Sequence, residues 1–388
     1  MDPGSVQPRV AAHPCVHQLD RTRFALDVHI RLANPEGPAH PDALSVQSRA
    51  VGVAQEGTVE LQVPPDARAE QPHRARLVRR SRASDVMRWS ERSGCTGFLI
   101  YSDNDNVDPW LLAQLAMLHT ERSVPLVAVQ PIAMHPHSVA KMITTLGQLH
   151  ERPVHVNLVS GGFVKHLESL DDHLPHDTRY TRLVEYARIV QGLLGNTTYS
   201  HSGDYFSVRN AHFSRPLRPD LAPRYFLSGS SPAAARAARD LRVPRLAYPR
   251  PVHDYEAGEP CPEGIRIGVL ARPDSAEAWR AATTRFPHSE TGRLIHEMAV
   301  EVSDSHWHGH LAARETAHTG TDTPYWLHPF RNYNTFCPYL VGGYQEVGTY
   351  LSRYLALGVR TLVLDVPAEE DDLHHTHRAL AEARQLTR

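Results

Sequence analysis

The chain has 388 residues, of which 22% are charged and 41% are hydrophobic, a composition typical of a globular, enzyme-sized protein. It excludes a disordered chain, a collagen and a coiled coil. The 41 basic and 43 acidic residues leave a net charge of −2, which provides no field to hold a polyanion. We therefore expect no nucleic acid among its partners.

The cysteines and the apolar runs indicate the compartment. Cys15, Cys95, Cys261 and Cys337 lie far apart and form no CxxC pair, which is typical of a protein kept reduced. No apolar segment follows Met1, and no apolar run approaches the roughly 18 residues that span a bilayer. The sequence therefore predicts a cytoplasmic protein that does not enter a membrane.

Regular secondary structure is expected from residue 84 onward. Residues 1–83 are rich in Pro, Ala, Arg and His and contain one clear strand candidate, at 24–32. We expect 1–83 to contribute the first strand and 84–388 to form the remainder of one domain. Helices are then predicted at 84–94, 109–119 and 136–149, and strands at 97–101, 125–129 and 154–159.

A helix beginning at Asp177 shows the periodicity most clearly. Arg182, Glu185 and Arg188 are expected on its solvent side. A hairpin is predicted after it, at 197–207, with Ser202-Gly203-Asp204 as the turn. The apolar residues that recur three and four apart, and so form one stripe against a sheet, are Tyr180, Leu183, Val184, Ala187, Val190 and Leu194.

The alternation of strand and helix resumes after the hairpin. Short apolar runs separated by amphipathic helices are typical of a buried parallel sheet, and eight strands in this order predict an α/β fold, a closed (β/α)₈ TIM barrel. Residues 286–339 are polar and His-rich and are expected to form a long, lid-like excursion after the seventh strand. The later elements are a strand at 224–227, a helix at 232–241 and strands at 245–248, 265–271 and 361–365.

Two segments at strand ends carry candidate binding residues, because barrel active sites lie at the carboxyl ends of the strands. Ser230 and Ser231 follow Gly229 and open a helix, where hydroxyls and helix amides form either an anion site or a plain helix cap. Asn157 is followed by Ser160 and two glycines. This run indicates either a backbone cleared for a flat ligand or a simple turn.

Together these segments resemble one family. The resemblance covers about residues 84–373 and is closest to the alkanesulfonate monooxygenase branch of the bacterial luciferase-like flavin monooxygenases. Residues before 84 match poorly. The segments that keep the order and spacing of that family are Asn157-Leu-Val-Ser-Gly-Gly162, His176-Asp-Thr-Arg-Tyr180, the hairpin, Tyr225-Phe-Leu-Ser-Gly-Ser-Ser231 and Ala356-Leu-Gly-Val.

The resemblance implies a barrel enzyme that uses reduced FMN and O₂ to oxygenate an organic small molecule, in a setting we expect to be natural-product biosynthesis. Reduced FMN would come from a separate flavin reductase, a transient partner, and the enzyme would be a homodimer or homotetramer. The residues that the resemblance assigns to the flavin are Ser230, Ser231, His176 and Tyr180 at the phosphate and Asn157 and Ser160 at the ring.

The substrate end departs from the sulfonate enzymes at three positions. Asn106 stands where the family has a cysteine after the second strand, Gly268 stands where it has a histidine, and 365–367 include no tyrosine. Sulfonate cleavage is therefore not expected. Arg266 is kept, and we expect Arg266 and Arg331 to hold an anionic group of the substrate while Asn106 orients it.

Other functions stay open. One is a deazaflavin-dependent oxidoreductase of the same superfamily, which passes hydride without O₂. Another is a barrel that binds a flavin or a phosphorylated ligand without catalysis, as the three lost site residues suggest. No metal is expected, because the His clusters at 306–310 and 374–377 do not lie at strand ends and the first strand carries only His29 where barrel metallohydrolases have two histidines.

Overall fold

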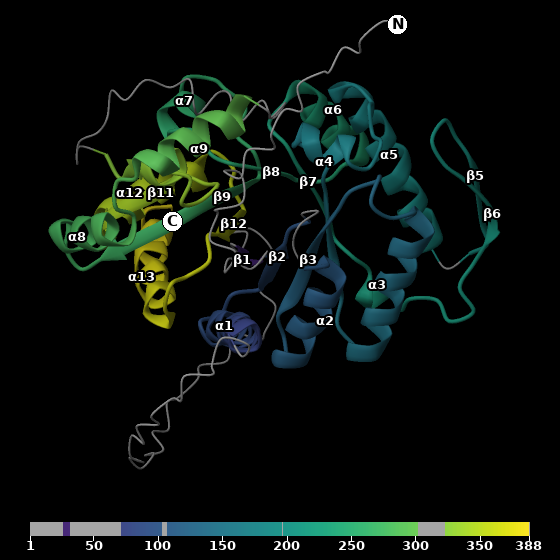
Figure 1. The fold of residues 1–388 in the computed structure, drawn as a ribbon, viewed down its shortest axis with the longest axis horizontal. Coiled ribbons are helices and arrows are strands. Elements are labelled where there is room, and N and C mark those ends of the chain that lie inside the picture. The colour runs from purple at the N-terminus through teal and green to yellow at the C-terminus, as the bar shows by residue number, and fades with distance from the viewer. Residues whose placement is uncertain (1–25, 32–70, 103–106, 196, 302–322, 388) are drawn as a thin grey trace, which may run out of the picture.

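The fold is an α/β arrangement in which helices surround one sheet (Figure 1). The structure is a computed structural model and describes residues 26–31, 71–102, 107–195, 197–301 and 323–387. The strands that form the main body of the sheet are β1 (Leu26–Arg31), β2 (Gly97–Ile100), β3 (Val124–Val129), β4 (His155–Leu158), β7 (Tyr225–Ser228), β8 (Arg245–Ala247), β9 (Gly264–Arg272) and β12 (Thr361–Leu364).

These strands pair in the order β9-β12-β1-β2-β3-β4-β7-β8. β8 also pairs with β9, with Leu246 opposite Gly264, so the series of pairings returns to the strand where it began. The neighbours are parallel except at β1, which runs antiparallel to both β12 and β2. The first strand therefore exists as predicted, but its direction departs from a regular (β/α)₈ alternation, because the residue pattern of one strand does not specify its direction.

Helices connect the strands and cover their outer face. Asp108 shows how they begin, since its carboxylate accepts the backbone N–H groups of Trp110 and Leu111 and Pro109 occupies the first turn of α2. Among the described residues, no helix has both the length and the apolar character needed to cross a membrane. The longer helices are α1 (Gln71–Arg92), α2 (Pro109–His119), α3 (Pro136–His150), α5 (His176–Leu193), α6 (Pro232–Leu241), α8 (Ser275–Arg285), α9 (Glu290–Glu301), α12 (Tyr344–Ala356) and α13 (Glu370–Leu386), and the shorter ones include α4 (Val164–Glu168) and α7 (Val252–Glu256).

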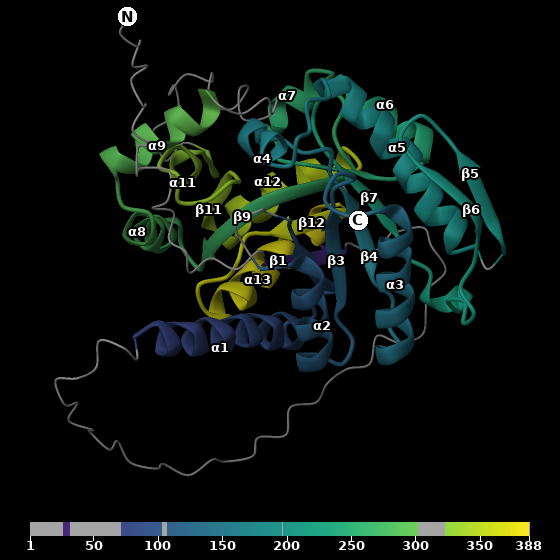
Figure 2. The same ribbon diagram turned by 45° about the vertical axis from the view of Figure 1, so that its right-hand side comes forward.

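The predicted hairpin is present as β5 (Tyr199–Ser202) and β6 (Ser207–Ala211). It lies beside α5, on the opposite side of the molecule from α8 and α9, in both views (Figures 1 and 2). The carboxylate of Glu185 on α5 accepts three backbone N–H groups at the turn of the hairpin. The hairpin is thus fastened to the helix that precedes it.

Side chains alternate along the strands between two cores. Phe98, Val127 and Leu362 belong to the large core beneath the helices. Successive residues of a strand point to opposite faces, so their neighbours on the same strands fill the inside of the ring. These inner residues form a separate cluster of Leu99, Leu126, Phe226, Leu246 and Val363.

α1 begins earlier than predicted. Ser84 does not cap a helix; it lies buried within a helix that starts at Gln71. The segment before Ser84 is rich in Arg and Ala, which are good helix formers, and Pro72 suits the first turn. These residues extend the helix across the boundary at residue 83.

Arg182 is buried, although its position in the periodic pattern predicted the solvent side. It forms an ion pair of 2.5 Å with Asp172, and the two side chains are 8% and 1% exposed. The partner comes from the loop before α5, so the pattern of the helix alone contained no signal for it. Arg188 is exposed, as predicted, whereas the Glu185 side chain is only 13% exposed because the hairpin turn packs on it.

The two ends of the excursion at 286–339 pack in a second core. Its described parts are α9, β10 (Tyr325–Trp326) and α11 (His328–Arg331), and β10 pairs with β11 (Tyr339–Gly343), which runs parallel to the second half of β9. Phe286 and Tyr339 pack there with their ring centroids 4.9 Å apart, and Trp326 lies beside them. The excursion therefore extends the sheet beyond the ring.

We expect Asp372→Ala to destabilise the fold by about 3–5 kcal/mol, because removing one partner of a buried ion pair leaves its charges uncompensated. Asp372 is 4% exposed and accepts from Arg272 and Arg285, at 3.2 and 2.9 Å, which ties α13 to β9 and α8. Urea denaturation measures the loss. The exposed Asp371→Ala is the control, and equal effects of the two substitutions would contradict this assignment.

The same carboxylate sets a pH dependence. Burial alone would raise the pKa of Asp372, but hydrogen bonds and charge from Arg285 and Arg272 outweigh it and hold that pKa below its ordinary value. A depressed pKa contributes stability that is present above the unfolded-state value of about 3.9 and is lost as the pH falls through the folded-state value. Acid unfolding of Asp372→Ala should therefore lack part of the pH dependence of the parent below about pH 4.

Candidate active site

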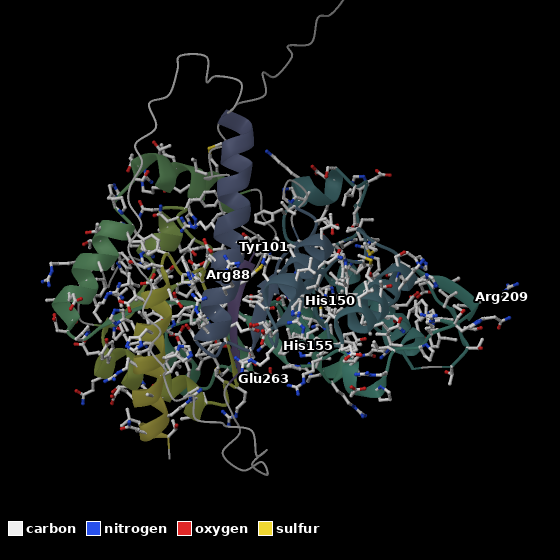
Figure 3. All side chains as sticks on the ribbon, turned by 90° about the horizontal axis from the view of Figure 1, so that it is seen from below. Arg88, Tyr101, His150, His155, Arg209 and Glu263 are labelled. Atoms are coloured by element: carbon white, nitrogen blue, oxygen red, sulfur yellow. The ribbon has the colours of Figure 1, made fainter. Side chains whose placement is uncertain are left out.

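A polar layer lies directly above the apolar inside of the ring. Residues two apart on a strand face the same side of the sheet. The residue that follows each inner-cluster residue by two places therefore also points inward, and it lies at the carboxyl end of its strand. Figure 3 shows Tyr101 at one end of the strands, and His155, which begins β4, and Glu263, which precedes β9, toward the other end. The residues two positions beyond the inner cluster on β2, β7, β8 and β12 are Tyr101, Ser228, Tyr248 and Asp365.

Asn157 is the inward polar residue of β4. It is 3% exposed, and its Oδ1 accepts a hydrogen bond of 2.9 Å from Ser228 Oγ on β7. Ser160 is similarly buried in the loop after β4. The two residues that the resemblance assigns to the flavin ring thus lie in β4 and in the loop directly after it.

Arg266 of β9 lies between two tyrosines. Its Nη1 donates to the Tyr248 hydroxyl at 2.8 Å, and its guanidinium carbon is 5.6 Å from the ring centroid of Tyr101 and 5.4 Å from that of Tyr248. Such cation–π contacts contribute about 0.5–2 kcal/mol each, and they orient the planar group. Arg266 therefore brings an oriented positive charge to the carboxyl ends of the strands.

Asp365 comes directly after β12 and accepts hydrogen bonds from two hydroxyls. Its Oδ2 accepts from Tyr339 at 2.6 Å and from Thr335 at 2.8 Å. Gly268 makes room for this arrangement, because a Cβ at that position would collide with the Tyr339 ring. Burial, with the charge of Asp365, raises the pKa of Tyr339 well above its ordinary value, so the phenol keeps its proton. A tyrosine hydroxyl thus reaches the end of β12 although none follows that strand in the sequence.

Ser231 caps α6, and its neighbour Ser230 is exposed. The Ser231 Oγ accepts the N–H of Ala234 at 3.1 Å, so Ser231 is the N-cap of α6. Gly229 before them has φ +153°, and a Cβ there would lie 2.5 Å from the hydroxyl oxygen of Tyr180. Because the cap uses Oγ only as an acceptor, the hydroxyl proton of Ser231 can serve a second partner.

His176 begins α5, beside this cap. Its Nδ1 lies 2.8 Å from Oδ1 of Asp177, and Arg236 of α6 donates to the other oxygen at 2.8 Å. The hydrogen bond from His176, with that from Arg236, holds the pKa of Asp177 below its ordinary value. The ionised carboxylate therefore joins the starts of the two helices and orients the imidazole.

This cluster has the donors that a phosphate dianion requires. It combines the hydroxyls of Ser230, Ser231 and Tyr180 with the first turns of two helices, whose N-terminal N–H groups attract anions. Gly229 keeps the backbone bare at its centre. Ser228, which precedes Gly229, donates a hydrogen bond to Asn157, so the phosphate-type cluster is continuous with the polar layer.

The remaining predicted substrate residues fall in different places. Arg331 lies on α11, half-buried, and burial lowers its pKa. The adjacent Phe330 packs against Tyr248, the tyrosine that binds Arg266. Tyr248 therefore connects the elements that carry the two arginines. Asn106 lies outside the described residues.

Removal of metals is predicted to leave activity and Tm unchanged. Within the described ranges, no group of three or more His, Cys, Asp or Glu side chains is arranged to hold a metal ion. His375 instead bonds the hydroxyl of Tyr344, and His377 bonds the Leu373 carbonyl. The histidines of 306–310 lie outside those ranges. A stoichiometric metal in the purified protein, with lower Tm after chelation, would contradict the prediction.

The fold and these two clusters define a class: an α/β barrel enzyme with its polar site at the carboxyl ends of the strands and a phosphate-type site at the helix after β7. Residues 62–361 match the luciferase-like monooxygenase family. The monooxygenase BtrO of Niallia circulans, named for its action on 4-(gamma-L-glutamylamino)butanoyl-BtrI acyl-carrier protein, is 31% identical over 306 aligned positions, and the match covers 76% of this chain and 89% of the relative. This chain belongs to the luciferase-like monooxygenase family.

Solved structures share the fold at low identity. The oxygenating constituent of 3,6-diketocamphane monooxygenase from Pseudomonas putida, in complex with FMN, is 16% identical with a TM-score of 0.55, over 78% of this chain and 91% of that one. An F420-dependent secondary alcohol dehydrogenase is 15% identical with a TM-score of 0.55, over 79% and 95%. The predicted barrel-type α/β fold and the flavin-dependent monooxygenase function are confirmed, whereas the alkanesulfonate branch is not singled out.

Proposed function

We propose that this protein uses reduced FMN and O₂ to oxygenate the acyl group of a thioester that is carried on an acyl-carrier protein, in natural-product biosynthesis. A separate reductase supplies the flavin, and the enzyme works in the cytoplasm as a homodimer or homotetramer. The observation that carries the proposal is the likeness to BtrO, which is 31% identical over 306 residues. Sulfonate cleavage is not part of the proposal, because Gly268 and Asn106 replace residues of the sulfonate enzymes.

Each cluster has a task under this proposal. Ser230, Ser231, Tyr180 and His176 bind the flavin phosphate, and Asn157 with Ser160 borders the ring. Bound reduced FMN supplies the electrons for the activation of O₂. Arg266 pairs with an anionic group of the substrate, for which its planar fork of N–H donors is suited. Asp365 accepts a hydrogen bond from Tyr339, so this pair holds a proton at the Tyr339 hydroxyl, in the polar layer at the carboxyl ends of the strands.

The F420-dependent dehydrogenase supports one rival, a deazaflavin-dependent hydride transfer. Titration of the purified protein with FMN, reduced FMN and reduced F420, followed by tryptophan fluorescence, separates the two. We expect reduced FMN to bind at micromolar or lower Kd and to be consumed in air. Tighter binding of F420, together with a reduced complex that is stable in air, would favour the rival.

The excursion at 286–339 stays our proposed cover of the site, and residues 302–322, which lie outside the described residues, are the part to remove. Replacing 302–322 with a short Gly-Ser linker should leave FMN affinity nearly unchanged but raise release of H₂O₂ at the expense of oxygenated product, because an open site admits water. A peroxidase-coupled assay measures the ratio. Loss of FMN binding, or unchanged coupling, would show that the segment is not a lid.

A further inference from the structure

Asn157 is a buried amide on the inner side of the strands. Its side chain is 3% exposed. In the register of the sheet its partners are Ala128 on β3 and Phe226 on β7, and Phe226 belongs to the inner cluster. Partners in register point to the same side of a sheet, so the amide also points inward. Neither partner has a side chain that accepts a hydrogen bond, so the amide must find its polar contacts elsewhere.

Ser228 determines which end of this amide it meets. It follows Phe226 by two places on β7 and therefore lies on the same inner side, one step nearer the carboxyl end. Its Oγ donates a hydrogen bond of 2.9 Å to the Oδ1 of Asn157. Because the amide oxygen faces the serine, the Nδ2 with its two N–H groups is turned away from Ser228.

The Nδ2 of Asn157 is a donor without a protein acceptor. Among the described residues, the one side-chain hydrogen bond of Asn157 is that from Ser228 to Oδ1. The completely enclosed polar atoms that lack a partner in this part of the chain do not include Nδ2, so a ligand can reach it. Buried amide groups in folded proteins are nearly always paired, and an unpaired one costs free energy. The two N–H groups are therefore available to an acceptor on a ligand.

We propose that Ser228 is a positioning residue that turns the amide of Asn157 so that its N–H groups donate to the flavin ring and favour the reduced flavin. This inference rests on the proposed function, because it takes the ligand to be a flavin. Ser228 directly precedes Gly229 and the phosphate-type cluster, and its hydroxyl bonds Asn157 on the neighbouring strand. One bond thus joins the candidate phosphate site to the candidate ring site.

The charge of the reduced flavin explains why the orientation of the amide matters. The oxidised ring is neutral, whereas the ring reduced by two electrons has lost a proton near neutral pH and carries a negative charge. A hydrogen bond to a charged acceptor is about twice as strong as one to a neutral acceptor. An amide that presents its N–H groups therefore binds reduced flavin preferentially, and one that presents its oxygen would repel the reduced ring. Hydrogen bonds to the ring are one of the means by which a protein tunes a flavin.

The test compares three serine variants. Ser228→Ala frees the amide to rotate, and Ser228→Thr keeps a hydroxyl at the same place. Ser200→Ala is the matched control, because Ser200 Oγ donates the same kind of bond, at 3.2 Å, to the Oδ1 of Asn210. That bond lies in the hairpin of β5 and β6, at the edge of the molecule (Figures 1 and 2). The probes are FMN and riboflavin, each oxidised and reduced, titrated without oxygen and followed by fluorescence.

Ser228→Ala should weaken the binding of reduced FMN about tenfold and that of oxidised FMN about twofold. The resulting fivefold change in the ratio of the two affinities lowers the reduction potential of the bound flavin by about 20 mV, since tenfold corresponds to about 30 mV for two electrons. Riboflavin should show the same change in ratio, because the effect is at the ring. Ser228→Thr and Ser200→Ala should stay within about twofold of the parent.

A double variant shows whether Ser228 acts through Asn157. Asn157→Leu removes the amide, and adding Ser228→Ala to it should change the ratio no further. An unchanged ratio in Ser228→Ala, or a loss of affinity for FMN but not for riboflavin, would overturn the inference. A parent that binds no flavin would refute both the inference and the proposed function. Flavin affinities that change as expected, in a protein that oxygenates no thioester, would refute the proposed function and support the inference.

Discussion

Replacing both Ser230 and Ser231 with alanine is expected to lower the affinity for reduced FMN by at least about tenfold, since each hydrogen bond to a charged phosphate contributes roughly 1.5–3 kcal/mol. Ser231 has two tasks here, because its Oγ also caps α6 through the N–H of Ala234. Riboflavin, which lacks the phosphate, should lose much less affinity. Fluorescence titration with both flavins measures the difference.

Single substitutions at position 231 separate the cap from the phosphate contact. Thr retains both the cap and a hydroxyl, so Ser231→Thr should keep most of the FMN affinity. Asp also caps helices but adds a negative charge, so Ser231→Asp should retain stability and lose FMN selectively. If Ser231→Asp bound FMN as well as the parent does, the phosphate would bind elsewhere.

Arg266→Ala is expected to lower kcat/KM by at least about 30-fold, because loss of a half-buried, hydrogen-bonded charge that pairs with a substrate anion costs about 2 kcal/mol or more. The guanidinium donates to Tyr248 and lies beside Tyr101, so its removal also leaves the Tyr248 hydroxyl without this donor. Arg266→Lys keeps the charge but not the planar fork and should recover only part of the loss. The assay uses the 4-(gamma-L-glutamylamino)butanoyl thioester of the BtrI acyl-carrier protein as substrate.

Tyr248→Phe is the control for orientation. It removes the hydrogen bond at 2.8 Å but keeps the aromatic ring beside the guanidinium, so it should raise KM by less than Arg266→Ala does. Reduced FMN should bind all these variants as it binds the parent. A kcat/KM for Arg266→Ala within about threefold of the parent would place the substrate's anionic group away from β9.

The helices and strands were predicted well from the apolar runs, because the pattern that buries a segment is contained in the residues of that segment. The helices at 109–119 and 232–241 appear as α2 and α6 with the same bounds, each with an N-cap and a proline in the first turn. The direction of β1 was not predictable, because antiparallel pairing to β2 and β12 depends on the connecting chain rather than on its own residues. Burial of Arg182 was missed for the same reason, since its partner Asp172 lies outside the helix.

The positions of the phosphate-type cluster in the fold were easier to predict than those of the substrate side, while the roles of both stay predictions. Ser231 begins α6, and His176 and Tyr180 lie in the first turns of α5, so local sequence patterns located them. Tyr339 was missed because it comes from β11, within the excursion, and meets Asp365 only through the folding of the sheet. The sequence contained one signal for Tyr339. Gly268 has no side chain at an inward position of β9, so a large neighbouring side chain must fill the space there.

Incorporation of ¹⁸O from ¹⁸O₂ tests the central claim most directly. The enzyme is mixed with chemically reduced FMN and the carrier-bound 4-(gamma-L-glutamylamino)butanoyl thioester under ¹⁸O₂, and the product is examined by mass spectrometry. A monooxygenase predicts one ¹⁸O atom in the acyl product and none from H₂¹⁸O in the reverse labelling. A product that carries no oxygen from O₂, or one that forms equally well without O₂, would contradict the account.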